Sequence, residues 1–271
     1  MSVLQRNNVR LLGKRSDPVL LFAHGFGCNQ AMWDAVASAF ADKTYQILFD
    51  YVGSGQSDLR CYQFERYATL QGYAQDILDI CDAIAIERDV IFIGHSVSCS
   101  IGVLAALARP QLFKEMIFLG PSPCFLNDPP HYYGGFEKSD LESLLALMNQ
   151  NYVGWAEYLA PVVAGPGNDS EIAGELTDSF CSTDPIIAQH FAKATFFADN
   201  RADFAKLSLP CLLLQHKEDA LASVSVGEFL HQQLKQSQLR VLDVAGHAAH
   251  MSHPGLVITA LQDYLTQRNI L

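Results

Sequence analysis

Apolar residues along the chain fall into short runs, and longer segments with helical spacing separate these runs. The clearest run, residues 19–23, carries no polar side chain on either face. A strand of this kind is typically buried on both faces of a parallel sheet. Further apolar runs also have strand length and end near glycine or charged residues. The strands expected on this basis are residues 19–23, 46–50, 90–93, 115–120, 211–215 and 239–244.

Helical periodicity fills the intervals between most of these strands. Residues 73–86, for example, place Ile77, Ile80 and Ile84 at helical spacing. Strands that alternate with helices predict an α/β fold, with a mostly parallel sheet and helices on both faces. The N-terminal residues 3–16 are expected to add a short edge hairpin. The other helices expected around the sheet are residues 31–41, 101–109 and about 254–264.

The alternation stops between residues 125 and 197, where helical patterns occur and no convincing strand does. Because this segment lies between two sheet strands, we expect a helical cap, or lid, over the carboxyl edge of the sheet. Residues 1–124 and 198–271 would then form the core domain, with the cap inserted at 125–197. The segment is rich in aromatic residues, most of which are expected to form the cap's own core while a few line an apolar pocket. The helices expected in the cap are residues 140–148, 154–162, 171–180 and 185–197.

Composition and charge narrow the class of protein. At 49% hydrophobic and 17% charged, a chain of 271 residues can bury a large core, so extended disorder is not expected. The formal net charge of −11 argues against binding to nucleic acid and to anionic membrane surfaces, because both require basic patches. We therefore expect neither nucleic acid nor membrane among its partners.

Location is also constrained by the sequence. The first eight residues contain no apolar signal-peptide core, and the long uncharged stretch 90–108 is interrupted by glycine, histidine and serine. The seven cysteines are odd in number and show no CxxC spacing, which disfavours a disulfide framework or a zinc site. A reducing cytoplasm is the expected setting.

Ser96 stands at the most informative point of the chain. The apolar run 90–93 ends at Gly94, and His95 and Ser96 follow before small residues open a helix. A serine on a sharp strand-to-helix turn is pushed out of the sheet. Its backbone N–H then lies near the positive end of the helix that follows. This pattern predicts a nucleophile. The alternative is a glycine turn that happens to contain a serine.

A serine nucleophile needs a base within hydrogen-bond reach and a third group that orients the base. Asp219 follows one predicted strand, and His247 follows the last one. The carboxyl ends of strands are where open α/β sheets gather their sites. The chain order of Ser96, Asp219 and His247 is also that of the α/β-hydrolases, which the sequence resembles. Glu218 remains the alternative acid.

Backbone N–H groups are expected to complete the site. A histidine–glycine turn, residues 24–27, follows the first central strand, and its glycines let the Phe26 N–H point into the site. Together with the Val97 N–H it would form an oxyanion hole, and the expected reaction is acyl transfer to water. The alternative is an ordinary turn between a strand and a helix. His24 and His95 flank the site by position.

Two other motifs do not support a ligand site. Residues 53–55 read Gly-Ser-Gly, but neither a third glycine nor a Lys-Ser/Thr pair follows as nucleotide loops require. His247, His250 and His253 recur at intervals of three, yet no carboxylate pattern accompanies them, so this is poor zinc architecture. No metal and no cofactor are therefore expected.

Five segments of the sequence resemble a narrower group within the α/β-hydrolases. They are similar to the RsbQ-type bacterial stress-regulator hydrolases and to the plant karrikin and strigolactone receptors. The resemblance implies an α/β-hydrolase fold with an eight-stranded type of sheet, a V-shaped cap of four helices and a small hydrophobic pocket. It also implies a triad of Ser96, Asp219 and His247. The segments are residues 48–55, 94–98, 120–128, 132–137 and 246–254.

By position in this resemblance, several side chains would contact a substrate: Phe26, His95, Phe125, Trp155 and Phe196. One departure from the general elbow pattern is Ser98, which replaces its second glycine; serine is small enough that catalysis is not put in doubt. Two functions stay open. The chain is either a serine esterase for small apolar esters or lactones, or a ligand sensor that signals to a protein partner with little turnover.

Overall fold

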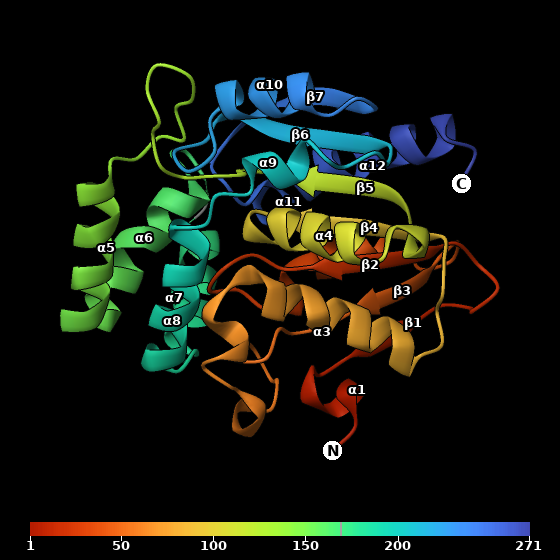
Figure 1. The fold of residues 1–271 in the computed structure, drawn as a ribbon, viewed down its shortest axis with the longest axis horizontal. Coiled ribbons are helices and arrows are strands. Elements are labelled where there is room, and N and C mark those ends of the chain that lie inside the picture. The colour runs from red at the N-terminus through yellow and green to blue at the C-terminus, as the bar shows by residue number, and fades with distance from the viewer. Residues whose placement is uncertain (169) are drawn as a thin grey trace.

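Seven strands form one sheet in the computed structural model, which describes residues 1–168 and 170–271 (Figure 1). Strand β1 pairs antiparallel with β3, and the remaining pairs are parallel. The predicted α/β class and the six predicted strands are confirmed, whereas the described sheet has seven strands rather than the eight implied by the resemblance. In spatial order the strands are β1 (Arg10–Leu12), β3 (Tyr45–Leu48), β2 (Val19–Ala23), β4 (Val90–His95), β5 (Phe113–Leu119), β6 (Cys211–Glu218) and β7 (Ser237–Ala245).

Helices cover both faces of the sheet (Figure 1). Alternate residues of β2 show why: Leu20 and Phe22 belong to one buried cluster, and Leu21 belongs to the other. Since successive side chains of a strand point to opposite faces, β2 needs a helical layer on each side. One layer contains α3 (Leu70–Ala83), α4 (Val97–Ala108), α9 (Arg201–Phe204) and α10 (Val224–Gln233); the other contains α2 (Asp34–Ser38), α11 (Ala249–Ser252) and α12 (Pro254–Gln267).

The N-terminal hairpin prediction is wrong. Residues Val3–Arg6 form a short helix, α1, and only the single strand β1 follows it. The reason is a capping box: the Ser2 hydroxyl accepts a hydrogen bond from the Gln5 N–H, and the Gln5 side chain accepts one from the Ser2 N–H. The helix predicted at 31–41 is likewise divided, because a 3₁₀ helix over Gln30–Trp33 precedes α2. Other 3₁₀ helices are Leu59–Cys61, Arg66–Ala68 and Pro110–Leu112.

Four helices lie beyond the end of the sheet toward which the arrow of β5 points (Figure 1). They follow β5 and precede β6, in the segment where the sequence predicted helices only. Asparagine and aspartate side chains start two of them: Asn151 accepts from the Gly154 N–H at 3.0 Å, and Asp184 accepts from the Ile186 N–H at 2.9 Å. Residue 169, which falls in this segment, lies outside the described residues. The four helices are α5 (Lys138–Gln150), α6 (Tyr152–Ala164), α7 (Ser170–Cys181) and α8 (Pro185–Phe196).

Across the part of the chain that the structure describes, no helix is both long enough and apolar enough to span a bilayer.

Candidate active site

Ser96 occupies the one-residue turn between β4 and α4. Its backbone has φ 57° and ψ −123°, a conformation that residues other than glycine rarely adopt. The Ser96 N–H donates to the Leu119 carbonyl of the neighbouring strand at 2.9 Å, which fixes the turn. The predicted sharp turn with Ser96 at its apex is therefore present.

Ser98 fits where the elbow pattern has a glycine because it makes two polar contacts. Its hydroxyl donates to the His24 carbonyl at 2.5 Å and lies 2.9 Å from the Tyr51 hydroxyl. Helix α4 packs close to its own strand here: a Cβ added to Gly94 would lie 3.1 Å from the Ser98 backbone. Ser98 thus ties the helix that follows the elbow to the loops after β2 and β3.

Asp219 and His247 meet at the carboxyl ends of β6 and β7. One oxygen of Asp219 accepts the backbone N–H groups of Leu221 and Ala222, at 2.8 and 3.0 Å. The other, Oδ2, lies 2.7 Å from His247 Nδ1, which is a hydrogen-bond distance. Glu218, the alternative acid, has an exposed side chain. Of the two acids, Asp219 is the one that contacts His247.

Electrostatics keep Asp219 ionised. Burial favours the neutral acid, but the imidazoles of His247 and His216 outweigh it and hold the pKa of Asp219 below its ordinary range. A carboxylate that accepts from His247 Nδ1 leaves Nε2 as the basic nitrogen of that ring. Within the described residues, His247 Nε2 has no hydrogen-bond partner, so the hydrogen bond to the Ser96 hydroxyl is not made in this conformation.

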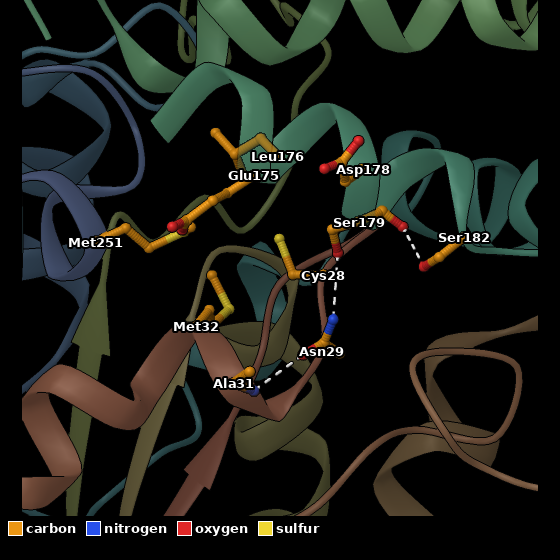
Figure 2. Close-up of a pocket in the computed structure, with 10 residues that line it drawn as sticks. All are labelled: Cys28, Asn29, Ala31, Met32, Glu175, Leu176, Asp178, Ser179, Ser182 and Met251. Carbon is orange, nitrogen blue, oxygen red and sulfur yellow. Dashed lines mark hydrogen bonds between the residues drawn. The ribbon is translucent and has the colours of Figure 1, made fainter. Parts of the chain in front are cut away.

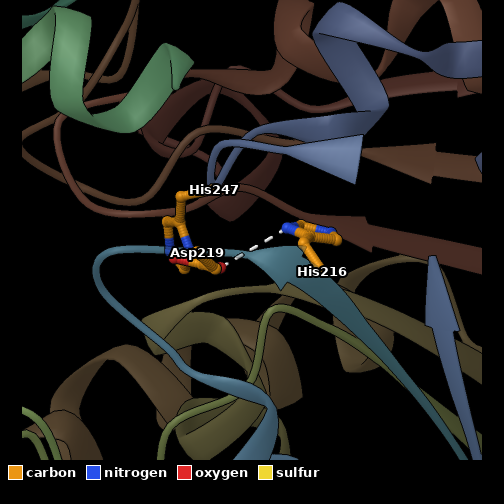
Figure 3. Close-up of side chains that lie close together, drawn as sticks. All are labelled: His216, Asp219 and His247. Carbon is orange, nitrogen blue, oxygen red and sulfur yellow. Dashed lines mark hydrogen bonds and ion pairs between the residues drawn. The ribbon is translucent and has the colours of Figure 1, made fainter. Parts of the chain in front are cut away.

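His216 is a member of this cluster that sequence reasoning missed. It lies at the end of β6 with its side chain fully buried, and its Nδ1 is 3.4 Å from Asp219 Oδ2 (Figure 3). Neither of its ring nitrogens makes a hydrogen bond within the described part of the chain. The available signal was a histidine directly after the predicted strand 211–215, three residues before the predicted acid.

Two further histidines surround His247. His95 Nε2 lies 2.9 Å from the His247 carbonyl oxygen, so His95 holds the loop that carries His247. The ring of His250 lies 4.5 Å from that of His95 and 4.5 Å from that of Trp33. Burial lowers the pKa of both His95 and His250 well below the ordinary value, so both are neutral at physiological pH.

Ser96 and His247 both line one small apolar cavity. Its volume of about 30 Å³ has room for roughly two water molecules. Ligand pockets are usually about 300–1,000 Å³, so a substrate larger than a few atoms requires lining side chains to move. The lining contains the expected Phe26, His95, Phe125 and Phe196, and it also contains residues that the sequence did not single out: Cys28, Leu159, Val163, Phe180, Thr195 and Leu221.

Trp155 does not line this cavity, contrary to expectation. Its ring lies 6.0 Å from that of Phe26 and 5.5 Å from that of Phe180, both of which do line it. The indole is almost completely buried and stacks on Tyr152 at 5.4 Å. Trp155 therefore supports the wall from behind, because Phe26 and Phe180 occupy the position nearest the cavity.

The oxyanion hole stays a prediction: Phe26 lines the same cavity as Ser96, and Val97 is the first residue of α4 after it. In the described residues, neither the Phe26 N–H nor the Val97 N–H donates to a backbone carbonyl in a turn or loop. The loop after Phe26 bends at Gly27, whose φ is +72°, and the Phe180 ring lies against this glycine. The Ser179 hydroxyl donates to the Gly27 carbonyl at 2.9 Å, so α7 holds this loop in place.

A larger groove lies outside the cavity, between α7 and the loop that leads into Gln30–Trp33 (Figure 2). Its volume is about 520 Å³, and the exposed carboxylates of Glu175 and Asp178 stand at it. Cys28 contributes to the walls of both the groove and the cavity. Burial raises the pKa of the Cys28 thiol to about 12, so this cysteine is no thiolate nucleophile. Neither Ser96 nor His247 lines the groove.

Comparison with known proteins places the chain among hydrolases. A family model described as "Alpha/beta hydrolase family" matches residues 20–260. The Karrikin insensitive 2 receptor CA of Petunia hybrida is 37% identical over 96% of this chain and 95% of its own length. Strigolactone esterase D14 of Arabidopsis thaliana is 32% identical over 93% and 94%, respectively. The structure of a hydrolase from Oleispira antarctica superposes with a TM-score of 0.94 at 44% identity, covering 97% of this chain and 96% of that one.

Proposed function

Because the chain belongs to the α/β-hydrolase family, we propose that it is a serine hydrolase that cleaves a small hydrophobic ester or lactone through an acyl-enzyme. The observation that carries this proposal is the position of His247. The Nδ1 atom of His247 lies 2.7 Å from the Asp219 carboxylate. His247 also lines the same cavity as Ser96, which stands at the apex of a strained turn. The proposal assigns Ser96 as the nucleophile, His247 as the base and Asp219 as the orienting acid, which are the three roles that acyl transfer needs.

The proposed reaction begins when Ser96 Oγ attacks the substrate carbonyl carbon. His247 Nε2 takes the hydroxyl proton, and the Asp219 carboxylate stabilises the imidazolium that results. The oxyanion accepts hydrogen bonds from the Phe26 and Val97 N–H groups, and the proton on His247 then passes to the leaving alkoxide. Water, activated by the same imidazole, cleaves the acyl-enzyme and restores Ser96.

We assign residues 125–197 the role of a cap and residues 1–124 and 198–271 that of the catalytic core. Support comes from the cavity lining, since Phe125, Leu159, Phe180 and Phe196 lie in the cap segment while Ser96 and His247 come from the core. Apolar walls exclude water and strengthen electrostatic interactions with the reacting atoms. They also select for apolar substrates.

A second candidate function is a ligand sensor that signals to a protein partner. The relatives named as karrikin receptors and the small volume of the cavity favour it, because ligand entry must rearrange the cavity wall and so can change the surface. Both functions use the same three residues. They differ in turnover, which is measurable.

The test is hydrolysis of short p-nitrophenyl esters by the wild type and by Ser96→Ala. We expect Ser96→Ala to lower kcat by about 10⁶-fold, close to background. Ser100→Ala is the matched control, because it removes a buried hydroxyl from α4, the helix that follows Ser96, and Ser100 does not line the cavity; this variant should retain activity. Equal activity of Ser96→Ala and wild type would refute the proposal.

The number of product molecules formed by each active site separates the two functions. Continued turnover favours the esterase. A single turnover, accompanied by a ligand-dependent rise in Tm, favours the sensor.

A further inference from the structure

Three side chains around Asp219 form a set of potential metal ligands. One ligand atom from each of His216, Asp219 and His247 lies within 4.8 Å of the other two, and no other such set occurs in the residues that the structure describes (Figure 3). Two imidazoles and one carboxylate are ligands that Zn²⁺ and related ions bind in proteins. The set differs from the spaced histidines of the sequence, because His250 and His253 take no part in it.

His216 is the observation that points to a ligand. Its side chain is fully buried, and neither of its ring nitrogens has a hydrogen-bond partner in the described residues. Leaving a buried polar group without a hydrogen bond is destabilising, so native structures rarely keep one without a reason. Serine hydrolysis as proposed above does not use this imidazole.

We propose that His216, Asp219 and His247 bind one divalent transition-metal ion such as Zn²⁺, and that the bound ion switches hydrolysis off. The switch rests on the proposed function, whereas the metal site does not. Hard ions such as Mg²⁺ are excluded as occupants, because they prefer oxygen ligands to imidazole.

Two of the three ligand separations are close to those of this ion, and the third is at most 4.8 Å. Zinc binds imidazole nitrogen and carboxylate oxygen at about 2.0–2.2 Å, which separates two ligands of a tetrahedral ion by roughly 3.3 Å. His216 Nδ1 and Asp219 Oδ2 already lie 3.4 Å apart. His247 Nδ1 and Asp219 Oδ2 are 2.7 Å apart, so the ion must open this hydrogen bond slightly.

Inhibition follows from the chemistry of the His247 ring. In hydrolysis, Nδ1 carries a proton that it donates to Asp219, and Nε2 is the base. A metal ion on Nδ1 requires the lone pair of that nitrogen, so the single proton of the neutral ring moves to Nε2. Nε2 then cannot accept the Ser96 proton. The same nitrogen therefore serves either the triad or the metal.

Metal binding is tested first without activity. Protein carrying Ser96→Ala and Cys181→Ser is titrated with Co²⁺ as a spectroscopic substitute for zinc, because Cys181 is an exposed thiol that could bind the ion. We expect visible d–d absorption of a four- or five-coordinate site, displaced by Zn²⁺. Adding His216→Asn should abolish the band, since asparagine places an amide near the Nδ1 position without a good ligand. His253→Asn, which changes a histidine outside the set, should leave it intact.

Inhibition is tested in the Cys181→Ser protein with Ser96 present. Zn²⁺ should abolish ester hydrolysis reversibly, with EDTA restoring it, and Mg²⁺ should have no effect. His216→Asn should raise the Zn²⁺ concentration for half-inhibition at least about tenfold over that of its parent, which corresponds to about 1.4 kcal/mol of binding. The His253→Asn control should match the parent.

These results separate the two proposals. Unchanged Co²⁺ spectra in His216→Asn, or no band in the parent, would overturn the metal site even if ester hydrolysis is normal. A His216-dependent band in a protein without esterase activity would keep the site and refute the proposed function.

If His216→Asn fails to fold, as judged by its melting curve, NMR of His247 decides the matter. Zn²⁺ should move the ring proton from Nδ1 to Nε2, and an unchanged tautomer at saturating Zn²⁺ would contradict the proposal.

Discussion

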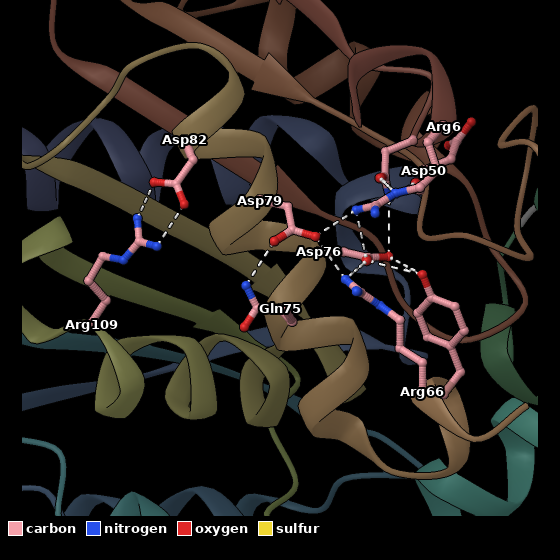
Figure 4. Close-up of polar contacts among 10 residues, drawn as sticks. Arg6, Asp50, Arg66, Gln75, Asp76, Asp79, Asp82 and Arg109 are labelled. Carbon is pink, nitrogen blue, oxygen red and sulfur yellow. Dashed lines mark hydrogen bonds and ion pairs between the residues drawn. The ribbon is translucent and has the colours of Figure 1, made fainter. Parts of the chain in front are cut away.

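Asp76 and Asp219 are both buried aspartates that face two basic side chains, yet their surroundings differ in kind. Asp76 lies on α3 and accepts from Arg6 and Arg66, with N–O distances of 3.1 and 2.8 Å (Figure 4). Asp219 follows β6 and faces imidazoles instead, at the carboxyl edge of the sheet. Guanidinium groups stay charged at every physiological pH, whereas an imidazole exchanges its proton readily.

The two aspartates also differ in whether a partner side chain keeps an atom that is free to react. Asp76 accepts further hydrogen bonds from Asn7 Nδ2 at 3.2 Å and from the Tyr67 hydroxyl at 3.1 Å, so its carboxylate is saturated by donors. Asp219 is held as firmly, but its partner His247 lines a cavity, and its Nε2 makes no hydrogen bond to any part of the chain that the structure describes. A buried charge therefore indicates chemistry only where its partner retains a free, titratable atom beside open space.

The largest expected difference between these two regions is in activity. Asp219→Asn should lower kcat for ester hydrolysis by about 10⁴-fold, because an amide no longer holds the His247 ring in the tautomer that leaves Nε2 basic. Asp76→Asn should stay within about tenfold of the wild type, since its contacts do not reach the cavity. Steady-state kinetics of both variants decide this, and a similar loss in both would erase the distinction.

The free energy of unfolding, in contrast, should depend strongly on Asp76. Asp76→Ala leaves Arg6 and Arg66 with Asp79 as their remaining carboxylate, removes the acceptor of the buried Asn7 and Tyr67 donors, and should lower the free energy of unfolding by about 1–3 kcal/mol. The matched control is Asp82→Ala on the same helix, which breaks an ion pair with Arg109. The Asp82 side chain in that pair is 58% exposed. That change should cost less than about 1 kcal/mol. Urea denaturation measures both, and equal costs would show that the Asp76 network is not structural.

The smallest expected effect is a difference in pH dependence. Burial raises the pKa of Asp76 despite Arg6 and Arg66, whereas the imidazoles lower that of Asp219. The folded state thus binds the Asp76 proton more tightly than the unfolded chain does, and the Asp219 proton less tightly. As the pH falls below about 5, the wild type should gain stability relative to Asp76→Asn and lose it relative to Asp219→Asn.

Each slope is at most about 1.4 kcal/mol per pH unit, and urea denaturation of the three proteins at several acidic pH values measures it. Comparison with the matching asparagine variant cancels the contributions of the other titrating groups. Two slopes of the same sign would contradict the assigned directions.

Local pattern was enough to predict the six strands and the elbow at Ser96, because apolar runs and their terminal residues are features of neighbouring positions. The selection of Asp219 and His247 also needed the chain order of the α/β-hydrolases. The N-terminal helix was missed because the Ser2–Gln5 capping box competes with a weak strand pattern. The Asp76 network was invisible for another reason. Its partners Arg6 and Arg66 are brought to α3 by tertiary packing alone.

The cavity was the least predictable part. Its walls depend on how aromatic rings from the four helices pack against one another, so Trp155 was expected at the surface of the cavity and lies behind it. Cys28 and Phe180 reach the cavity through the bend at Gly27, which no periodicity reports. His216 came closest to being predictable, since it lies on β6 only three residues before Asp219.

The central claim is that Ser96 is a nucleophile activated by His247 and Asp219. The most direct measurement is peptide mass spectrometry after treatment with a serine-directed sulfonyl fluoride. The account predicts a single covalent adduct on Ser96, formed much more slowly in Asp219→Asn and at an unchanged rate in Asp76→Asn, with loss of ester hydrolysis in step with labelling. An unmodified Ser96 under conditions that label a known serine esterase, or an adduct on Ser98 instead, would contradict it.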